Sequence, residues 1–282
     1  YEQTKTRNGV TFKLTTTVRN IDDPFDGTIG GSPNDLSPAD SKQIEVTVAC
    51  ASCAMPTTPV ILNTRVAPEG PESSTGGGAL FISVFDSAGS ALAQASVHIE
   101  KDENGDGTPE STIDDVTGNN GELRLIDISP AVEAYKITAT KSGYSTDNTV
   151  VASEGNPNPL KPPATVAAQT VTNISFSIDK ISSFNLSTQN IFCSAISSVS
   201  IDAHGSKIIG ANPDIYKYEQ TVSTNGNGQK TLSNMEWDTY SFALPSASSY
   251  DIAGSIPTLP VALAPDSQQD LTFILKSHTT NS

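Results

Sequence analysis

The chain has 282 residues, of which 36% are hydrophobic and 17% charged, and its formal net charge is −15. A chain of this length can form two or three domains with cores of their own. The acidic balance excludes nucleic acid as an expected partner, because binding to the phosphate backbone requires a basic face. No apolar run reaches the roughly 18 residues of a membrane-spanning helix, and the low hydrophobic content is typical of secreted all-β proteins.

Residues 1–68 are expected to form a small antiparallel β-sheet. Apolar and polar side chains alternate in this part of the chain, which indicates half-buried strands. The strands are predicted at residues 10–20, 42–49 and 59–67. Three strands barely make a stable domain, and the exposed face of their sheet must be covered. A helix that precedes Tyr1 is the natural candidate for this cover.

The segment at residues 22–40 is rich in Asp, Gly, Pro and Ser and is predicted to form a long loop. It contains three acidic residues near its start, Asp22, Asp23 and Asp26. Their spacing matches no metal-binding motif, and we therefore interpret them as part of a solvated loop.

Three segments of this N-terminal part carry a resemblance to a known family. They read TVRNIDDP at residues 17–24, ADSKQIEVTV at residues 39–48 and LNTRVAP at residues 62–68. This pattern resembles the globular part of bacterial type IV pilin-like proteins. The resemblance implies a long hydrophobic helix before Tyr1, which would anchor the subunit in the membrane and then pack it into a filament. It also implies other filament or surface subunits as partners, with membrane contact only through that helix.

Residues 69–78 are dominated by Gly, Ser, Glu and Pro, a composition typical of flexible linkers. This linker marks the boundary between the N-terminal module and the rest of the chain. After it, short strands are predicted at residues 80–85, 95–100, 122–128, 135–140, 148–152 and 171–178. Short strands separated by turns predict a β-sandwich at residues 79–180.

Two sequence features of this sandwich carry a second resemblance. One is Gly143-Tyr-Ser after a strand, and the other is a V-x-D-x-x-G sequence followed by A-x-V-x-I. They are similar to the transthyretin-like regulatory domain that is attached to carboxypeptidases and to many surface proteins. The resemblance implies an accessory module without an activity of its own, in which the Gly and Tyr positions serve turns and packing.

Two stretches of the chain repeat each other at an interval the size of a domain. Equivalent positions lie 105 to 107 residues apart, namely Thr117 and Thr224, Gly121 and Gly228, Leu125 and Leu232, and Tyr135 and Tyr240. This interval is too long for a solenoid repeat. We therefore expect a second β-sandwich at residues 181–282. The predicted fold is all-β, with a small pilin-like antiparallel sheet followed by two Ig-like or transthyretin-like β-sandwiches.

The strongest chemical motif is an acidic loop in the first predicted sandwich. Oxygen-bearing side chains stand at alternating positions, namely Asp102, Asn104, Asp106, Thr108 and Glu110. Hard oxygen donors at this spacing can converge on one calcium ion, and Gly107 permits the sharp turn. The Glu that an EF-hand needs at position 12 is replaced by Ile113, and Asp114 or Asp115 could substitute. The alternative interpretation is an Asp-Gly-rich hairpin turn that binds nothing.

The three cysteines do not form a disulfide scaffold. Cys50 and Cys53 are expected either to make a local disulfide or to remain unpaired thiols. A Cys-x-x-Cys pair without a nearby His cannot complete a tetrahedral zinc site, so metal or redox use is the weaker alternative. Cys193 stands between apolar neighbours and is expected to be a buried free thiol.

Catalysis has little support in the sequence. None of the three histidines, His98, His204 and His278, neighbours a credible Ser, Cys or Asp arrangement, and hydrolase, zinc-protease and phosphate-binding motifs are absent. The single Trp, Trp237, would stand exposed as a stacking platform in a sugar-binding module, but a packing role is the simpler interpretation.

These features favour a non-enzymatic cell-surface or pilus-associated protein with a structural or adhesion role. Its sandwiches would project outward and meet a host, cell-surface or glycan ligand, and calcium would rigidify one of them. The alternative is a carbohydrate-binding or accessory region of a secreted enzyme, with Trp237 as a ligand contact.

Overall fold

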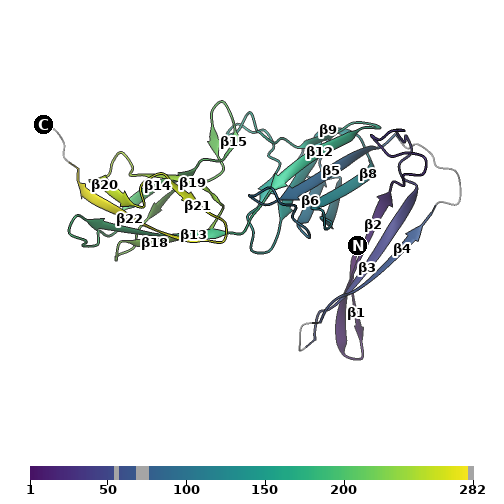
Figure 1. Cartoon of the computed structure of the whole chain (residues 1–282), viewed down its shortest axis with the longest axis horizontal. Coiled ribbons are helices and arrows are strands. Elements are labelled where there is room, and N and C mark those ends of the chain that lie inside the picture. The colour runs from purple at the N-terminus through teal and green to yellow at the C-terminus, as the bar shows by residue number, and fades with distance from the viewer. Residues whose placement is uncertain (54–56, 68–75, 279–282) are drawn as a thin grey trace.

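The computed structural model describes residues 1–53, 57–67 and 76–278. These residues form strands, turns and loops, and none of them belongs to a helix that could cross a membrane. The predicted all-β fold class is confirmed. Three modules follow one another along an elongated molecule, with the N-terminal sheet at one end and the C-terminal sandwich at the other (Figure 1).

The first module is a four-stranded antiparallel sheet with the strand order β1-β2-β3-β4. Its strands are β1 (Glu2–Arg7), β2 (Val10–Ile21), β3 (Ser41–Cys50) and β4 (Val60–Val66). The three predicted strands are present as β2, β3 and β4. The fourth, β1, was missed because it contains no apolar side chain that would reveal a period of two. β1 and β2 join through Asn8 and Gly9, both with positive φ. An Asn-Gly pair favours such hairpins and was the signal for the fourth strand.

The second module is a β-sandwich of two sheets. Its strands are β5 (Gly78–Phe85), β6 (Ser96–Lys101), β7 (Ser111–Val116), β8 (Glu122–Ile128), β9 (Ala131–Thr140), β10 (Asp147–Asn148), β11 (Ala164–Val166) and β12 (Val171–Ser177). One sheet has the order β12-β5-β8, and the other has the order β10-β9-β6-β7 with β11 beside β9. Their inner faces enclose a core in which Leu80, Ile82 and Phe176 are fully buried. The predicted linker at residues 69–78 lies mainly outside the described residues.

The third module repeats this plan. Its strands are β13 (Ser182–Asn190), β14 (Ser200–Gly205), β15 (Ile208–Gly210), β16 (Ile215–Tyr216), β17 (Glu219–Ser223), β18 (Gln229–Met235), β19 (Asp238–Ala243), β20 (Tyr250–Ile256), β21 (Val261–Leu263) and β22 (Gln268–Ser277). The main sheets have the orders β18-β13-β22-β20 and β17-β14-β19-β21. In both sandwiches the first long strand pairs with the last one in parallel, β5 with β12 and β13 with β22.

The sequence repeat builds the same corner in each sandwich. Thr117 and Thr224 are both buried, and their hydroxyl groups accept hydrogen bonds of 3.0 Å from the backbone N–H groups of Ala95 and Val199. Four residues further on stands a glycine with φ near +70°. Its carbonyl accepts a 2.8 Å hydrogen bond from the first strand of the sandwich in both copies. The threonine and glycine therefore recur because each closes a tight turn against the core.

A Pro-rich loop of the first sandwich, between β10 and β11, contacts the second sandwich. Leu160 N–H donates to the Ile209 carbonyl and Ala211 N–H donates to the Asn158 carbonyl, both over 3.0 Å, so the loop pairs with strand β15 of the next module. The Lys180 ammonium and the Asp266 carboxylate add an ion pair of 2.6 Å. These backbone and side-chain contacts hold the sandwiches end to end (Figure 1).

The free cysteine lies outside the core. Cys193 is exposed in the turn that follows β13, with φ at 61°, and Phe192 beside it is 80% exposed. The prediction of a buried thiol was therefore wrong. Apolar neighbours in sequence do not indicate burial here, because the segment leaves the sandwich at the end of a strand.

The repeat corner generates a stability prediction. Gly228 has φ at +70°, and a Cβ there would lie 2.8 Å from the carbonyl oxygens of Thr188 and Ile196. Gly228→Ala should therefore lower the free energy of unfolding of the second sandwich by about 2–4 kcal/mol. Urea unfolding followed by Trp237 fluorescence measures this change.

The matched control is Gly226→Ala in the same turn, where an added Cβ meets nothing within 4 Å. This variant should stay within about 1 kcal/mol of the parent. Equal losses in the two variants would show that the corner does not depend on close backbone packing.

Candidate functional site

One face of the N-terminal sheet is apolar and uncovered. Cross-strand pairing places Leu14 opposite Val48 and Val46 opposite Leu62, so that their side chains share a face. The same register assigns to this face the apolar residues Val10, Phe12, Leu14, Val18, Ile44, Val46, Val48, Val60, Leu62 and Val66, together with the polar residues Thr16, Asn20, Lys42 and Thr64. The strand β1 contributes polar residues to this face and forms its rim.

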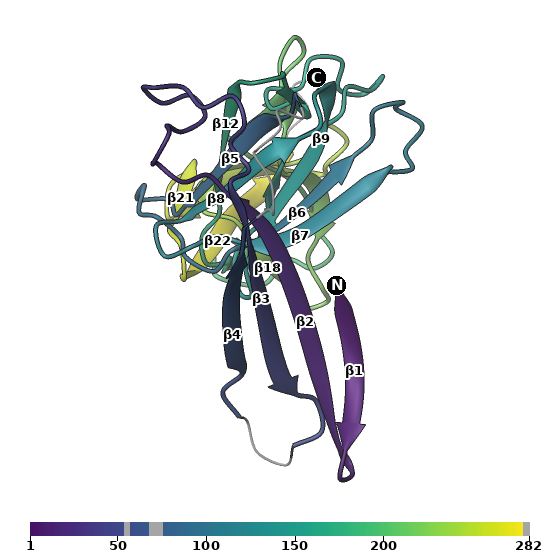
Figure 2. The ribbon, with the colours of Figure 1, turned by 90° about the vertical axis from the view of Figure 1, so that its right-hand side faces the viewer.

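The exposure of this face is unlike that of the sandwiches. Leu62 is 60% exposed, Val60 59% and Val18 54%, and Ser41 is the one buried residue in the four strands. In the two sandwiches, by contrast, Phe176 and Phe273 are fully buried. Figure 2 shows the sheet extending away from the sandwiches, with no described element over most of its length. Exposed apolar side chains gathered on one face in this way are typical of an interaction site.

The opposite face of the sheet is mainly polar, and its residue Arg19 contacts the first sandwich. Arg19 Nε donates to Asp115 Oδ2 over 2.6 Å, and Nη2 bonds the other carboxylate oxygen. This hydrogen bond raises the pKa of the Arg19 guanidinium above its ordinary value. Asn20, which the register places on the same face as Val66, adds a 3.1 Å bond from its Nδ2 to the Ile126 carbonyl. The contact with the sandwich therefore lies at one end of β2, and the side chains of Val60 and Leu62 in β4 stay exposed.

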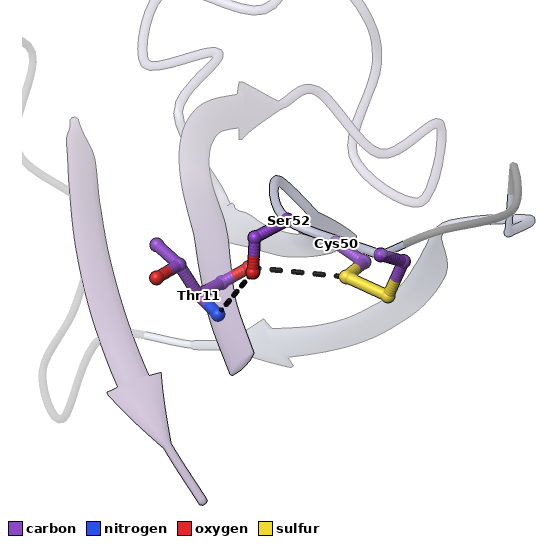
Figure 3. The surroundings of a disulfide bond; sticks show 4 residues. Thr11, Cys50 and Ser52 are labelled. Atoms are coloured by element: carbon purple, nitrogen blue, oxygen red, sulfur yellow. Dashed lines mark hydrogen bonds between the residues drawn. A yellow bond between two sulfur atoms is a disulfide. The ribbon is translucent and has the colours of Figure 1, made fainter. Parts of the chain in front are cut away.

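A disulfide closes one end of the sheet. Cys50 at the end of β3 is bonded to Cys53 (Figure 3). Between them, Ser52 Oγ accepts a 2.8 Å hydrogen bond from Thr11 N–H of the neighbouring strand. The disulfide and this bond hold the chain beside β2 as it leaves the sheet.

The Asp102 loop is closed by the protein itself. Asp102 Oδ2 lies 2.6 Å from Lys136 Nζ, and Oδ1 accepts a 2.8 Å bond from Gly105 N–H. Asn104 and Asp106 bond mainly within the loop. Lys136 lowers the pKa of Asp102, and backbone N–H groups of Gly107 and Gly105 lower it further. Calcium binding by Asp102, Asn104, Asp106, Thr108 and Glu110 stays a prediction, and it would require the ammonium to leave Asp102.

Trp237 lies at the junction of the two sandwiches. Its ring is half-buried and lines a hollow of about 350 Å³ together with Leu160 and Ile208. Lys207 Nζ lies 3.2 Å from the ring centroid, so one ring face is occupied by a cation. Glycan stacking on this residue stays a prediction.

Two of the histidines form hydrogen bonds with carboxylates, and the third packs against an aromatic ring. His98 Nδ1 lies 2.6 Å from Asp114 Oδ1 and His278 Nδ1 lies 2.8 Å from Asp251 Oδ1. His204 is in strand β14 and packs on the Tyr216 ring at 4.4 Å between centroids.

The acidic residues of the loop at 22–40 separate into two groups. Asp26 is exposed, as a solvated loop requires, but Asp22 turns inward and meets Asp35 and Asp40. Partial burial raises the pKa of Asp22, and the charges of Asp35 and Asp40 add to this effect. The interpretation of Asp22 as simply solvated was wrong. Asp35 and Asp40 lie 13 and 18 positions further along the chain, and the residues next to Asp22 give no sign that the loop folds back and brings these two to it.

No family model matches the chain, and no curated protein matches its sequence. Comparison with solved structures found the Bacillus anthracis TIE protein, with 11% identity, a TM-score of 0.28 and coverage of 98% of this chain. The chain spans 58% of that protein's length. The Streptococcal ancillary pilin shows 9% identity and a TM-score of 0.31, with 82% of this chain and 75% of that one covered. The minor pilin GBS52 of Streptococcus agalactiae shows 10% identity and the same TM-score, with 73% and 98% covered.

The Asp102–Lys136 pair generates a pH prediction. A carboxyl group with a lowered pKa in the folded state stabilises the fold above its ordinary pKa of 3.8, and this contribution is lost as pH falls through the lowered value. Asp102→Asn should therefore melt below the parent chain at neutral pH, and the two melting temperatures should converge between about pH 5 and about pH 2. A gap that stays the same over this range would show that the ion pair is not its cause.

Proposed function

We propose that this protein is a non-enzymatic, pilin-like structural subunit of an extracellular surface filament. The single observation that carries the proposal is the uncovered apolar face of the N-terminal sheet. In the assembled protein, this face packs against the long hydrophobic helix that we expect before Tyr1 in the full-length chain, as in the type IV pilin-like family. The two sandwiches, which we assign to the transthyretin-like class, then project from the filament.

Energetics favour a covered face. Full burial of one Val or Leu side chain contributes about 1.5–3 kcal/mol. Four side chains of this face, those of Val18, Val60, Leu62 and Val66, are more than half exposed. A sheet in which only Ser41 is buried has no core to offset the entropy cost of its own ordering. A second layer on the apolar face supplies that core.

A helix suits this face better than a further strand. The apolar residues lie across the face of β2, β3 and β4, whereas an added strand would pair at an edge and leave the face open. A helix satisfies its own backbone hydrogen bonds and needs only one apolar stripe toward the sheet.

The end-to-end arrangement of the sandwiches supports a spacing or adhesion role. The contacts between Leu160 and Ile209 and between Lys180 and Asp266 hold two self-sufficient cores in line, away from the sheet (Figure 1). Calcium at the Asp102 loop belongs to the same proposal and would rigidify the first sandwich.

The proposal predicts a face-specific assembly defect. Leu62 and Ile61 are neighbours in β4 with similar exposures, 60% and 57%, but they stand on opposite faces of the sheet. In cells that produce the full-length protein, Leu62→Glu should reduce incorporation into surface filaments at least about tenfold, because the charge would have to be buried. Ile61→Glu should leave incorporation nearly unchanged. Immunogold labelling of filaments with an antibody against the second sandwich measures both.

Neither substitution removes a buried side chain, so both variants should keep the melting temperature of the isolated chain. Normal assembly of Leu62→Glu would refute the proposed packing, and equal loss in the two variants would refute its restriction to the apolar face.

A further inference from the structure

We propose that Asp22, Asp35 and Asp40 together bind one divalent cation of the calcium class, and that this cation fixes the loop between β2 and β3 that packs against the first sandwich. The site is distinct from the Asp102 loop and does not depend on the proposed filament function. It consists of residues from one loop, between strands β2 and β3.

The three carboxylates converge on one point. Each offers an oxygen atom, and these atoms lie within 4.8 Å of one another. Asp22 Oδ1, Asp35 Oδ2 and Asp40 Oδ1 are buried and have no hydrogen-bond partner. Asp35 itself is only 8% exposed. A buried carboxylate oxygen without a donor is costly, and a shared cation satisfies all three at once.

The other oxygen of each carboxylate is held by the backbone of the same loop. Asp22 Oδ2 accepts a 2.9 Å bond from Ile29 N–H, and Asp35 Oδ1 accepts a 2.8 Å bond from Ser37 N–H. Asp40 Oδ2 accepts a bond from Asp23 N–H. These bonds orient the carboxylates, so that one oxygen of each is left for a common ligand. The arrangement is therefore preorganised.

No side-chain cation neutralises this cluster in the part of the chain that the structure describes. None of its ion pairs with Lys, Arg or His involves Asp22, Asp35 or Asp40. Three ionised carboxylates at this separation repel one another strongly in a partly buried site. Carboxylate oxygens are the ligands that calcium prefers, and its irregular coordination suits a loop that leaves room for water or backbone carbonyls.

The loop is the place where such a cation would matter for the molecule. Ile29 is 4% exposed and packs against Ala79 and Ile126 of the first sandwich. The backbone N–H group of Ile29 donates the hydrogen bond that Asp22 Oδ2 accepts. A cation on Asp22 therefore acts one hydrogen bond away from the residue that docks the loop. Its binding should fix the sheet relative to the sandwich.

Hydrogen exchange of the unmodified chain tests the site directly. Mass spectrometry compares the chain in millimolar calcium chloride with the chain in EDTA. We expect exchange in peptides covering residues 22–40 to slow at least about tenfold with calcium. Unchanged exchange in these peptides, or protection only in peptides covering residues 102–110, would overturn the proposal.

Two matched double variants and their combination locate the binding energy. Calcium should raise the melting temperature of the parent by on the order of 5 °C. Asp102→Asn with Asp106→Asn should still respond to calcium, and adding Asp35→Asn and Asp40→Asn to that variant should abolish the remaining rise. In EDTA, Asp35→Asn with Asp40→Asn should melt at or above the parent, because it removes repulsion between carboxylates. If Asp35→Asn with Asp40→Asn melts below the parent by the same amount with and without calcium, the three carboxylates have a purely structural role and the proposal is wrong.

Discussion

The uncovered apolar face of the N-terminal sheet is the constraint on which the organisation of this protein depends. Each sandwich encloses its own core between two sheets, so it can be stable without help. The first module has strands of the same kind but a single layer, and its Val and Leu side chains remain in contact with water. A single-layered sheet obtains a core only by packing against a partner. We therefore place the assembly contact at the N-terminal sheet and expect the two C-terminal sandwiches to project from the assembly.

The connection between these ends is made by charged and polar groups. Arg19 and Asp115 join the polar face of the sheet to the sandwich, and Ile29 docks the long loop beside them. Asp22 accepts a hydrogen bond from the N–H group of Ile29 and lies close to Asp35 and Asp40. One buried oxygen of each of the three carboxylates has no hydrogen-bond donor. The orientation of the N-terminal sheet therefore depends on a few polar contacts and on the small apolar cluster around Ile29, and a cation on Asp22 would strengthen them. This division leaves the apolar face free for a partner.

Much of the fold could be predicted from local patterns. The Thr117 and Thr224 repeat identified two related sandwiches, because a buried hydroxyl and a positive-φ glycine are needed at the same corner of each. Strand β1 was missed because an edge strand exposed on both faces shows no apolar period. Cys193 was misplaced because apolar neighbours in a turn resemble a short strand.

The candidate sites depend on contacts that sequence spacing does not show. Asp35 and Asp40 are far along the chain from Asp22, and only the folded loop brings them together. The Asp102 motif was visible in sequence, but the position of Lys136 beside it was not, because that residue comes from another strand. The apolar face was foreseeable from alternation in β2 and β3, but its uncovered state is seen only in the exposed side chains of Val60 and Leu62.

Chemical labelling of single cysteines on intact cells tests the role of the apolar face most directly. Cys193 is an exposed free thiol, so Cys193→Ser first removes its background labelling. Leu62→Cys or Ile61→Cys is then introduced into this full-length variant. If the face is covered in the assembled state, a membrane-impermeant maleimide will label Ile61→Cys on cells, and will label Leu62→Cys only after the protein is dissociated. Equal labelling of both cysteines on intact cells would show that the face stays open to solvent, and would contradict its role in assembly.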